Sequence, residues 1–232
     1  MKKCVFLLFF FAFFGLLQAQ NLQLHYDFGK GRQYLTTTVE MFKPDKHGST
    51  FFFVDMDYDL SNAKVKLAYW EIARDLKFWK APIAFHTEYN GGFGQSDIGI
   101  AYQINSAFLN GATYSYNNDD FTKGISFMVA HKYITGKKEQ SFQLTAVWYM
   151  KFFKSKLVFS GFADFWKEKN NFFMNAPLGT ETSFVFLTEP QLWYHITKKF
   201  AVGTEWEIAS NFASYKGFKV CPTIALKYVF NE

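Results

Sequence analysis

The sequence is short of cysteine and of long apolar runs. It contains two cysteines in 232 residues, and Cys4 lies in an N-terminal segment that we expect to be removed. The remaining Cys221 cannot form an intramolecular disulfide, and no residue spacing typical of a zinc site occurs. No apolar run reaches the roughly 18–20 residues that a spanning helix needs. These absences exclude a disulfide scaffold, a zinc module and a helical membrane protein.

A large excess of charge of one sign is also missing. The chain has 25 Lys and Arg against 20 Asp and Glu, a net charge of +5, and removal of Lys2 and Lys3 would reduce the excess further. So small an excess, with no basic cluster interleaved with aromatic residues, does not fit a nucleic-acid-binding surface. We therefore expect no nucleic-acid partner.

Aromatic residues, by contrast, are abundant. The chain has 31 Phe, 13 Tyr and 6 Trp, which make 22% of the residues, while charged residues make 19%. Disordered chains are poor in aromatic residues, so disorder is excluded. A soluble domain of this size would have difficulty burying so many rings. Another environment must therefore accommodate them.

The first residues have the pattern of a secretory signal. Lys2 and Lys3 precede an apolar stretch from Val5 to Leu17, and Ala19 follows as a small residue. A basic start, a short apolar region and a small residue before the cut are typical of signal peptides. We predict a signal peptide over residues 1–19 and one mature domain over residues 20–232. The alternative, an uncleaved membrane anchor, needs a longer apolar stretch.

Alternation of apolar and polar residues recurs along the mature chain and predicts strands. Near the C-terminus, for example, Ile224, Leu226 and Tyr228 alternate with Ala225 and Lys227. The predicted strands are 22–28, 33–42, 50–58, 64–73, 82–90, 95–104, 110–117, 121–132, 140–152, 156–167, 183–196, 199–210 and 218–230.

Thirteen strands are an awkward number, because single-chain outer-membrane barrels of bacteria have an even number. The strands from residue 33 onward make twelve, so 22–28 is either an N-terminal insert or a sign that one strand has been divided in two. Long loops outside and short periplasmic turns are the expected asymmetry. It assigns 43–49, 74–81, 105–109, 133–139, 168–182 and 210–217 to one side, and 59–63, 91–94, 118–120, 153–155 and 197–198 to the other.

The predicted fold is all-β, a transmembrane antiparallel up-and-down β-barrel of about twelve strands. Each strand is long enough to cross a bilayer when tilted. Closure removes the sheet edges that lipid cannot satisfy, and the aromatic residues can face lipid and its two interfaces. The alternative is a soluble β-sandwich or lipocalin-like barrel. Pro190 and Pro222 lie within predicted strands, and we expect a bulge at each.

The face that we assign to the interior is rich in carboxylates. The cations that we assign to it are fewer: Lys219 and Lys227, with His86 and His195 as titratable groups. Such an interior would repel phosphates and favour neutral or cationic solutes. The alternative is that the carboxylates pair with misplaced Lys and Arg and fill a plugged barrel. The predicted interior acidic residues are Glu40, Asp55, Asp57, Glu88, Asp164, Glu189, Glu205 and Glu207.

Twelve strands leave an interior between the filled eight-stranded and the wide sixteen-stranded barrel. Inward Tyr34, Phe53, Trp166 and Trp193 could offer flat surfaces for stacking, or could serve ordinary packing. No catalytic motif links the Ser and His residues, so we expect no enzyme, and we expect no cofactor and no metal site. His86 and Glu88 should face the same way as a pair. We interpret residues 90–94 as a hairpin turn rather than a phosphate loop.

Several segments resemble the nucleoside-specific channel-forming outer-membrane porins, the Tsx-like family. They are Thr36–Phe42, Ser49–Asp55, Tyr69–Arg74, Gly161–Phe165, Leu187–Tyr194 and Ala225–Phe230. The resemblance implies a monomeric twelve-stranded barrel that passes nucleosides by diffusion. By matching position it also implies that Glu40, Asp55, Glu71, Asp164 and Glu189 face the lumen. The chain departs from the usual assembly signal, because it ends Phe230-Asn231-Glu232 rather than on the aromatic residue.

Together these observations predict a passive outer-membrane channel for small nucleoside-like solutes, located in a Gram-negative outer membrane after export. Its partners would be outer-membrane lipid, the solute and the barrel-assembly machinery. The alternative is a non-conducting barrel whose extracellular loops bind a partner or ligand.

Overall fold

The computed structural model describes residues 20–96, 98–171 and 174–230. The predicted signal peptide, residues 1–19, lies outside the described residues. No helix in the described part of the chain is long and apolar enough to span a membrane.

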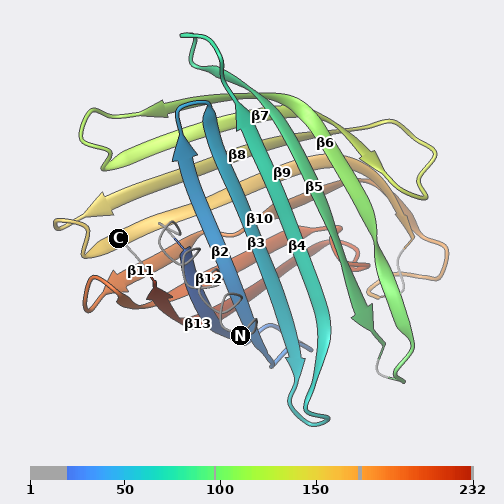
Figure 1. The fold of residues 1–232 in the computed structure, drawn as a ribbon. Coiled ribbons are helices and arrows are strands. Elements are labelled where there is room, and N and C mark those ends of the chain that lie inside the picture. Colours follow the sequence, from blue (N-terminus) through green and yellow to red (C-terminus); the bar gives the residue numbers. More distant parts are fainter. Residues whose placement is uncertain (1–19, 97, 172–173, 231–232) are drawn as a thin grey trace, which may run out of the picture.

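Strands account for all the regular structure in the described ranges (Figure 1). They are β1 (Gln20–Asp27), β2 (Leu35–Asp45), β3 (Gly48–Asp59), β4 (Lys64–Leu76), β5 (Ile83–Gln95), β6 (Ala101–Asn117), β7 (Lys123–Ile134), β8 (Ser141–Phe152), β9 (Leu157–Asn171), β10 (Glu181–Thr188), β11 (Gln191–His195), β12 (Phe200–Ser210) and β13 (Phe218–Val229).

The strands form a closed antiparallel barrel. Except for β10 and β11, consecutive strands pair with each other, and β1 closes the ring by pairing with β13. Both β10 and β11 pair with β9 on one side and β12 on the other. They keep one register, since Thr188 is opposite Ile208 and Gln191 is opposite Glu205. They are therefore one strand of the wall, interrupted at 189–190, and the barrel has the predicted twelve strands.

The predicted division of the chain into strands needs one correction. The predicted segment 22–28 is no insert, because residues 22–27 lie in β1 as part of the wall. The predicted strands 95–104 and 110–117 belong mostly to one long strand, β6. Of the two explanations for the thirteenth strand, division of one strand in two is the right one.

Glycine misled the prediction of a turn at 91–94, whereas the predicted break at 105–109 contains no glycine. Residues 91–94 lie within β5 rather than in a hairpin turn, and 105–109 lie within β6 rather than in a connection. A Cβ added at Gly92 would lie against the carbonyl oxygen of Ala68, and one added at Gly111 against that of Val129. These glycines permit close approach of neighbouring strands, so they belong to the wall rather than to turns.

The connections fall into two sets at opposite ends of the barrel. The termini end holds connections 46–47, 77–82, 118–122, 153–156 and 196–199, together with Gln20 and Phe230, whose backbones are joined by a hydrogen bond of 3.0 Å. The loop end holds 28–34, 60–63, 98–100, 135–140, 174–180 and 211–217.

The predicted grouping of connections agrees with this arrangement from 118 onward and is inverted before it. Connections 46–47 and 77–82 lie at the termini end, and 60–63 lies at the loop end. The cause is the division of β6 into two predicted strands. One extra strand in the count assigns every earlier connection to the opposite end of the barrel.

The bulges predicted at Pro190 and Pro222 are wrong, because the register is the same on both sides of each proline. The ladder is interrupted there without a shift. The N–H of Trp206 donates to the carbonyl oxygen of Pro190 at 3.1 Å, and Trp206 lies opposite Pro222. Both prolines therefore lie at the level of Trp206, one on each side of β12, and the sheet accommodates them without a change of register.

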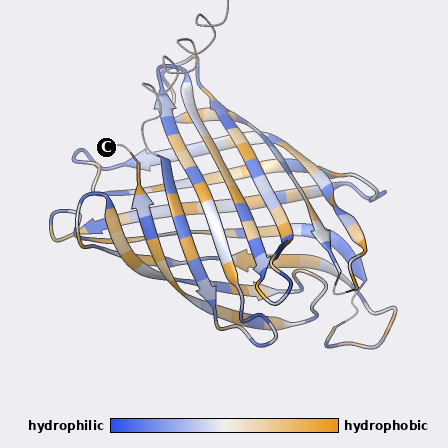
Figure 2. Cartoon of the chain, turned by 60° about the horizontal axis from the view of Figure 1, so that its bottom comes forward, coloured by the Kyte–Doolittle hydropathy of each residue, from blue (hydrophilic) through white to orange (hydrophobic). Residues whose placement is uncertain are grey.

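Successive side chains point to opposite faces of the wall, and apolar and polar residues alternate along many strands (Figure 2). On β7, Phe127 and Val129 are 49% and 60% exposed, whereas Met128 and Ala130 are 5% and 3% exposed. Exposed apolar side chains thus cover the outer surface, as expected of a barrel that faces lipid.

Candidate functional site in the barrel interior

The pairing register places all ten sequence-predicted site residues on the same face of the sheet. This face includes Asn21, Gln23, His25 and Asp27 of β1, which pair across to the even-numbered residues of β2. Continuing the register around the ring adds Glu40, Phe53, Asp55, Asp57, Glu71, Glu88, Asp164, Glu189, Glu205 and Glu207.

This face is the interior of the barrel. The ring centroids of His25 on β1 and Trp193 on β11 are 5.9 Å apart, although β12 and β13 separate these strands in the wall. Such a contact can only cross the inside. The ammonium group of Lys227 lies 4.0 Å from the centre of the same Trp193 ring.

Three of the interior carboxylates are bound by threonine hydroxyls on the neighbouring strand. Thr38 donates to Asp55 at 2.5 Å and Thr36 donates to Asp57 at 2.6 Å, both between β2 and β3. Thr145 on β8 donates to Asp164 on β9 at 2.5 Å. Each donor lies directly opposite its carboxylate in the register, so these are cross-strand pairs of the kind that stabilise a sheet.

Three more carboxylates receive a hydrogen bond from another neutral side chain. The amide of Asn21 donates to Glu40 at 2.9 Å, and the hydroxyl of Tyr69 donates to Glu71 at 2.7 Å. The amide of Gln191 donates to Glu205 at 2.5 Å. These six residues are therefore held by neutral donors. In the described ranges, their one contact with a basic side chain within ion-pair distance is 3.9 Å, between Glu205 and His25, and it is an ion pair only when His25 is protonated.

One predicted carboxylate, Glu207, is engaged by a guanidinium group. Arg32, in the connection 28–34, contacts Glu207 at 2.7 Å and Asp27 at 2.8 Å. Burial opposes the charge of Arg32, yet the carboxylates of Glu207 and Asp27 raise its pKa above the ordinary value. Burial also raises the pKa of the neighbouring Tyr34, whose hydroxyl accepts a hydrogen bond of 2.8 Å from Arg32. This pairing keeps Arg32 charged and Tyr34 neutral.

The predicted pair of His86 and Glu88 forms, with a separation of 3.1 Å. The other ring nitrogen of His86 lies 2.8 Å from Asp75. Glu88 keeps one buried oxygen, Oε1, without a hydrogen-bond partner, and Asn90 keeps Oδ1 likewise. This part of the interior thus holds two unsatisfied acceptors side by side on β5.

The remaining predicted residues contribute less clearly to a site. Glu189 lies at the interruption between β10 and β11, where its N–H donates to the carbonyl oxygen of Phe162 at 3.1 Å. Phe53 contacts Tyr69 with ring centroids 6.0 Å apart. Trp193 is only 1% exposed and Trp166 only 6%. Both tryptophans are covered, which favours the packing role over a stacking surface.

Sequence reasoning missed three interior basic side chains, His25, Arg32 and Lys132. The ammonium group of Lys132 donates to Gln143 at 2.6 Å and lies 4.3 Å from the centre of the Trp166 ring. The alternation of β7 could have placed Lys132 on the face of Met128 and Ala130. No local signal places Arg32, because it belongs to a connection that folds inward.

Two connections meet over the interior at the loop end. Asn175 donates to the carbonyl oxygen of Lys216 at 2.7 Å, and Met174 forms an isolated bridge with Tyr215. The Phe212 ring packs edge-on against Trp166, with centroids 6.0 Å apart. A cavity of about 40 Å³ remains there, lined by residues that include Arg32, Glu207, Tyr215 and Lys219. The loop end is therefore narrowed by side chains.

Solved structures share this fold. One described as the NanC porin matches with a TM-score of 0.59 at 10% sequence identity, over 90% of this chain and 99% of that chain. LpxR from Salmonella typhimurium matches with a TM-score of 0.46 at 8% identity, over 90% of this chain and all of that one. The first match shows the fold of an outer-membrane barrel. The TM-score of the second match is too low to show a shared fold.

Comparison at the level of sequence gives a family. No match was found among curated proteins. The predicted resemblance to nucleoside-specific channels is confirmed only as a likeness to outer-membrane barrels, and membership of that family stays a prediction. A family model described as a domain of unknown function, DUF5020, matches residues 19–230, and the chain therefore belongs to the DUF5020 family.

Proposed function

We propose that the protein is an outer-membrane channel through which small, uncharged or cationic, nucleoside-like solutes diffuse passively. The observation that carries the proposal is the set of six interior carboxylates bound by neutral donors rather than by cations. Each keeps acceptor capacity for a passing solute, and together they disfavour anions.

The unsatisfied oxygens of Glu88 and Asn90 add support. A solute that carries hydroxyl or amino groups could donate to them as it passes. Contacts of this kind are weak and exchange with water, as conduction requires. Solute contacts by Glu40, Phe53, Asp55, Glu71 and the other predicted residues are part of this proposal.

A liposome-swelling assay tests the proposal. Proteoliposomes are exposed to a nucleoside and to its monophosphate at equal osmolarity, with empty liposomes as the control. We expect faster swelling with the nucleoside, because the carboxylates repel phosphate. Equal rates for both solutes would contradict an acidic passage.

Ion selectivity, measured in planar bilayers, can be compared between two matched variants. Asp55→Lys places a positive charge on the inward face, whereas Asp119→Lys makes the same charge change in the exposed connection 118–122. We expect Asp55→Lys to weaken or reverse cation preference and Asp119→Lys to leave it unchanged. Equal shifts for the two variants would mean that Asp55 does not border an open passage.

The second candidate is a non-conducting barrel whose loops bind a partner or ligand. The contacts of Phe212 with Trp166 and of Asn175 with Lys216 favour it, because they narrow the loop end. The same swelling assay decides, since a closed barrel passes neither solute.

A further inference from the structure

The two ends of the barrel differ in the surroundings of their basic residues. At the loop end, several cations pair with carboxylates, although Lys30, Lys138 and Lys216 have no ion pair in the described ranges. Arg32 contacts Asp27 and Glu207, Lys137 contacts Glu168 at 3.4 Å, and Lys169 contacts Glu139 at 2.7 Å. Much of the positive charge at that end is thus neutralised within the protein.

At the termini end, Arg74 pairs with Asp45, but exposed lysines of most connections have no ion pair in the described ranges. Five exposed lysines have no ion pair within the described ranges, and they come from four of the five connections. They are Lys46, Lys80, Lys154, Lys156 and Lys199. Two of the nearby acidic residues are engaged elsewhere, since Asp45 binds Arg74 at 2.6 Å and Asp120 accepts hydrogen bonds within its own turn, whereas Asp119 is exposed.

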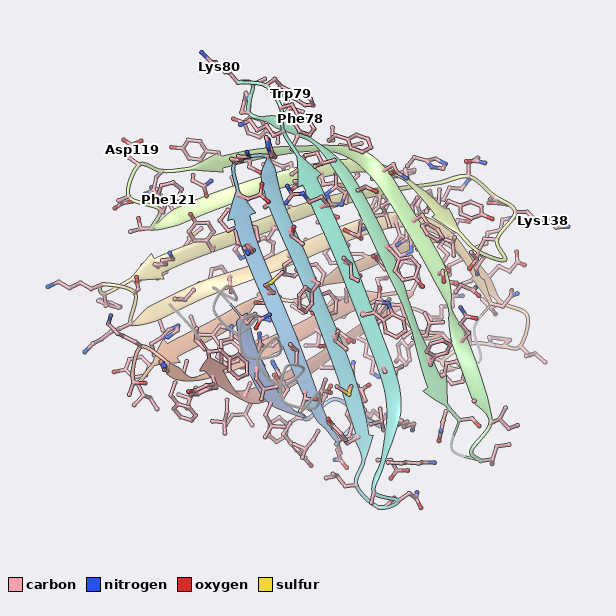
Figure 3. The ribbon with its side chains drawn as sticks, in the orientation of Figure 1. Phe78, Trp79, Lys80, Asp119, Phe121 and Lys138 are labelled. Carbon is pink, nitrogen blue, oxygen red and sulfur yellow. The ribbon has the colours of Figure 1, made fainter. Side chains whose placement is uncertain are left out.

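Exposed aromatic rings lie among these lysines. Phe78 is 69% exposed, Trp79 47%, Phe121 61% and Phe153 77%. They occupy the same set of connections, and Figure 3 shows Phe78, Trp79 and Lys80 projecting together from one of them. The five lysines and four rings form what we call the collar. It adjoins the exposed apolar surface of the strands, where Ile83 is 46% and Phe152 44% exposed.

We propose that the collar binds the anionic headgroups of phospholipids that surround the termini end. Lysine ammonium groups attract anionic lipid at a membrane surface, and Phe and Trp rings settle at the same depth. Short connections are expected on the periplasmic side of such barrels, which favours phospholipid as the partner. The proposal rests on the membrane location in the proposed function and not on its solute.

Trp79 provides a reporter inside the collar. Its indole N–H donates to the carbonyl oxygen of Ile83 at 2.7 Å, which fixes the ring beside Lys80. The full chain and a Trp79→Phe variant are reconstituted in vesicles that contain brominated phosphatidylglycerol or brominated phosphatidylcholine at equal mole fraction. The difference in quenching between the two proteins isolates the signal of Trp79. We expect phosphatidylglycerol to associate about fivefold more strongly, the factor that one lysine near an anionic surface supplies.

Two triple variants separate the collar from net charge. Lys80→Gln with Lys154→Gln and Lys199→Gln removes three collar charges. Lys30→Gln with Lys138→Gln and Lys216→Gln removes three exposed charges at the loop end. We expect the preference to fall toward one in the first variant only, and to weaken with salt in the native chain. Folding is verified by mobility on unheated gels, and Lys80→Gln alone replaces a triple variant that does not fold.

Equal loss of preference in both triple variants would overturn the proposal, because net charge would then explain the attraction. Absence of any preference would also overturn it and would leave an acidic soluble protein as the occupant. The result is independent of the swelling assay, since a barrel that conducts nothing can still prefer anionic lipid.

Discussion

Two regions of the interior differ in a way that separates function from stability. The polar wall consists of the inward side chains Thr36, Thr38, Glu40, Asp55, Asp57 and Glu71, on β2, β3 and β4, and all are half-buried. The packed wall consists of Ala107, Leu109, Met128, Ala130 and Ile134, on β6 and β7, and none is more than 6% exposed. One barrel thus combines hydrogen-bonded polar groups that remain accessible with a small apolar core.

The comparison shows that the interior surface is polar in one region and apolar in another. The apolar cluster needs no water and stabilises the fold by burial. The threonine–carboxylate pairs stabilise neighbouring strands and still keep free acceptor positions. We therefore expect changes in the packed wall to affect stability, and changes in the polar wall to affect what can enter.

The largest contrast is expected in thiol reactivity. Cys221 is 0% exposed, and a Cβ added at Gly29 would lie 2.6 Å from its sulfur. A water-soluble thiosulfonate should therefore label Glu40→Cys, made in a Cys221→Ser background, faster than native Cys221 by orders of magnitude. Labelling is followed by mass spectrometry. Protection of the new cysteine would show that the polar wall is closed to solvent.

A large effect on stability is expected from Leu109→Ala in the packed wall. Leu109 is 0% exposed, and the change leaves a cavity, so it should lower the free energy of unfolding by about 2–5 kcal/mol. Leu144→Ala is the matched control, because Leu144 is 42% exposed on the outer face. Urea titration in lipid vesicles measures both. Similar losses in the two variants would remove the distinction between core and surface.

A smaller effect is expected from Thr38→Val in the polar wall. Valine keeps the shape of threonine but removes the hydroxyl that donates to Asp55 at 2.5 Å. Because water can replace part of this hydrogen bond, the loss should be about 1 kcal/mol. A double-mutant cycle with Asp55→Ala isolates the coupling between the two side chains. A coupling near zero would mean that the pair does not stabilise β2 against β3.

The smallest effect concerns Glu139 in the connection 135–140, outside both walls. A hydrogen bond from Lys169 and the nearby charge of Lys167 hold the pKa of Glu139 below its ordinary value. The stability that this contributes is present above the ordinary pKa and is lost as the pH falls through the lowered one. Glu139→Gln should flatten this part of the pH profile slightly, because an exposed pair is screened. An unchanged profile in thermal unfolding would contradict the shift.

Much of the fold and of the inward face could be predicted because alternation reports the face directly. On β3 and β12 the acidic residues occupy every second position, so Asp55, Asp57, Glu205 and Glu207 could be placed on one face from sequence alone. The strand register in the structure then shows that the inward positions of these separate strands line one interior. That step needs the pairing of strands, which periodicity within one strand does not contain.

The errors have definite physical causes. Glycine is a turn signal in sequence, yet in β5 it permits close strand contact, so a turn was predicted inside that strand. The break predicted at 105–109 then divided β6, and the early connections were inverted. Proline removes a donor, and the prediction of a bulge assumed that an intact ladder had to be repaired around it. Arg32 acts through a long-range contact with Glu207, which no local pattern records.

The pairing of β1 with β13 has a consequence for assembly. Asn21 is opposite Val229, so the contact that closes the ring joins the two extremes of the folded chain. Until the last strand arrives, both β1 and β12 expose unpaired edges that can pair with other chains. Contacts so distant in sequence form slowly. Completion of the barrel is therefore an event of the whole chain, and a nascent or shortened chain would need protection of its two open edges.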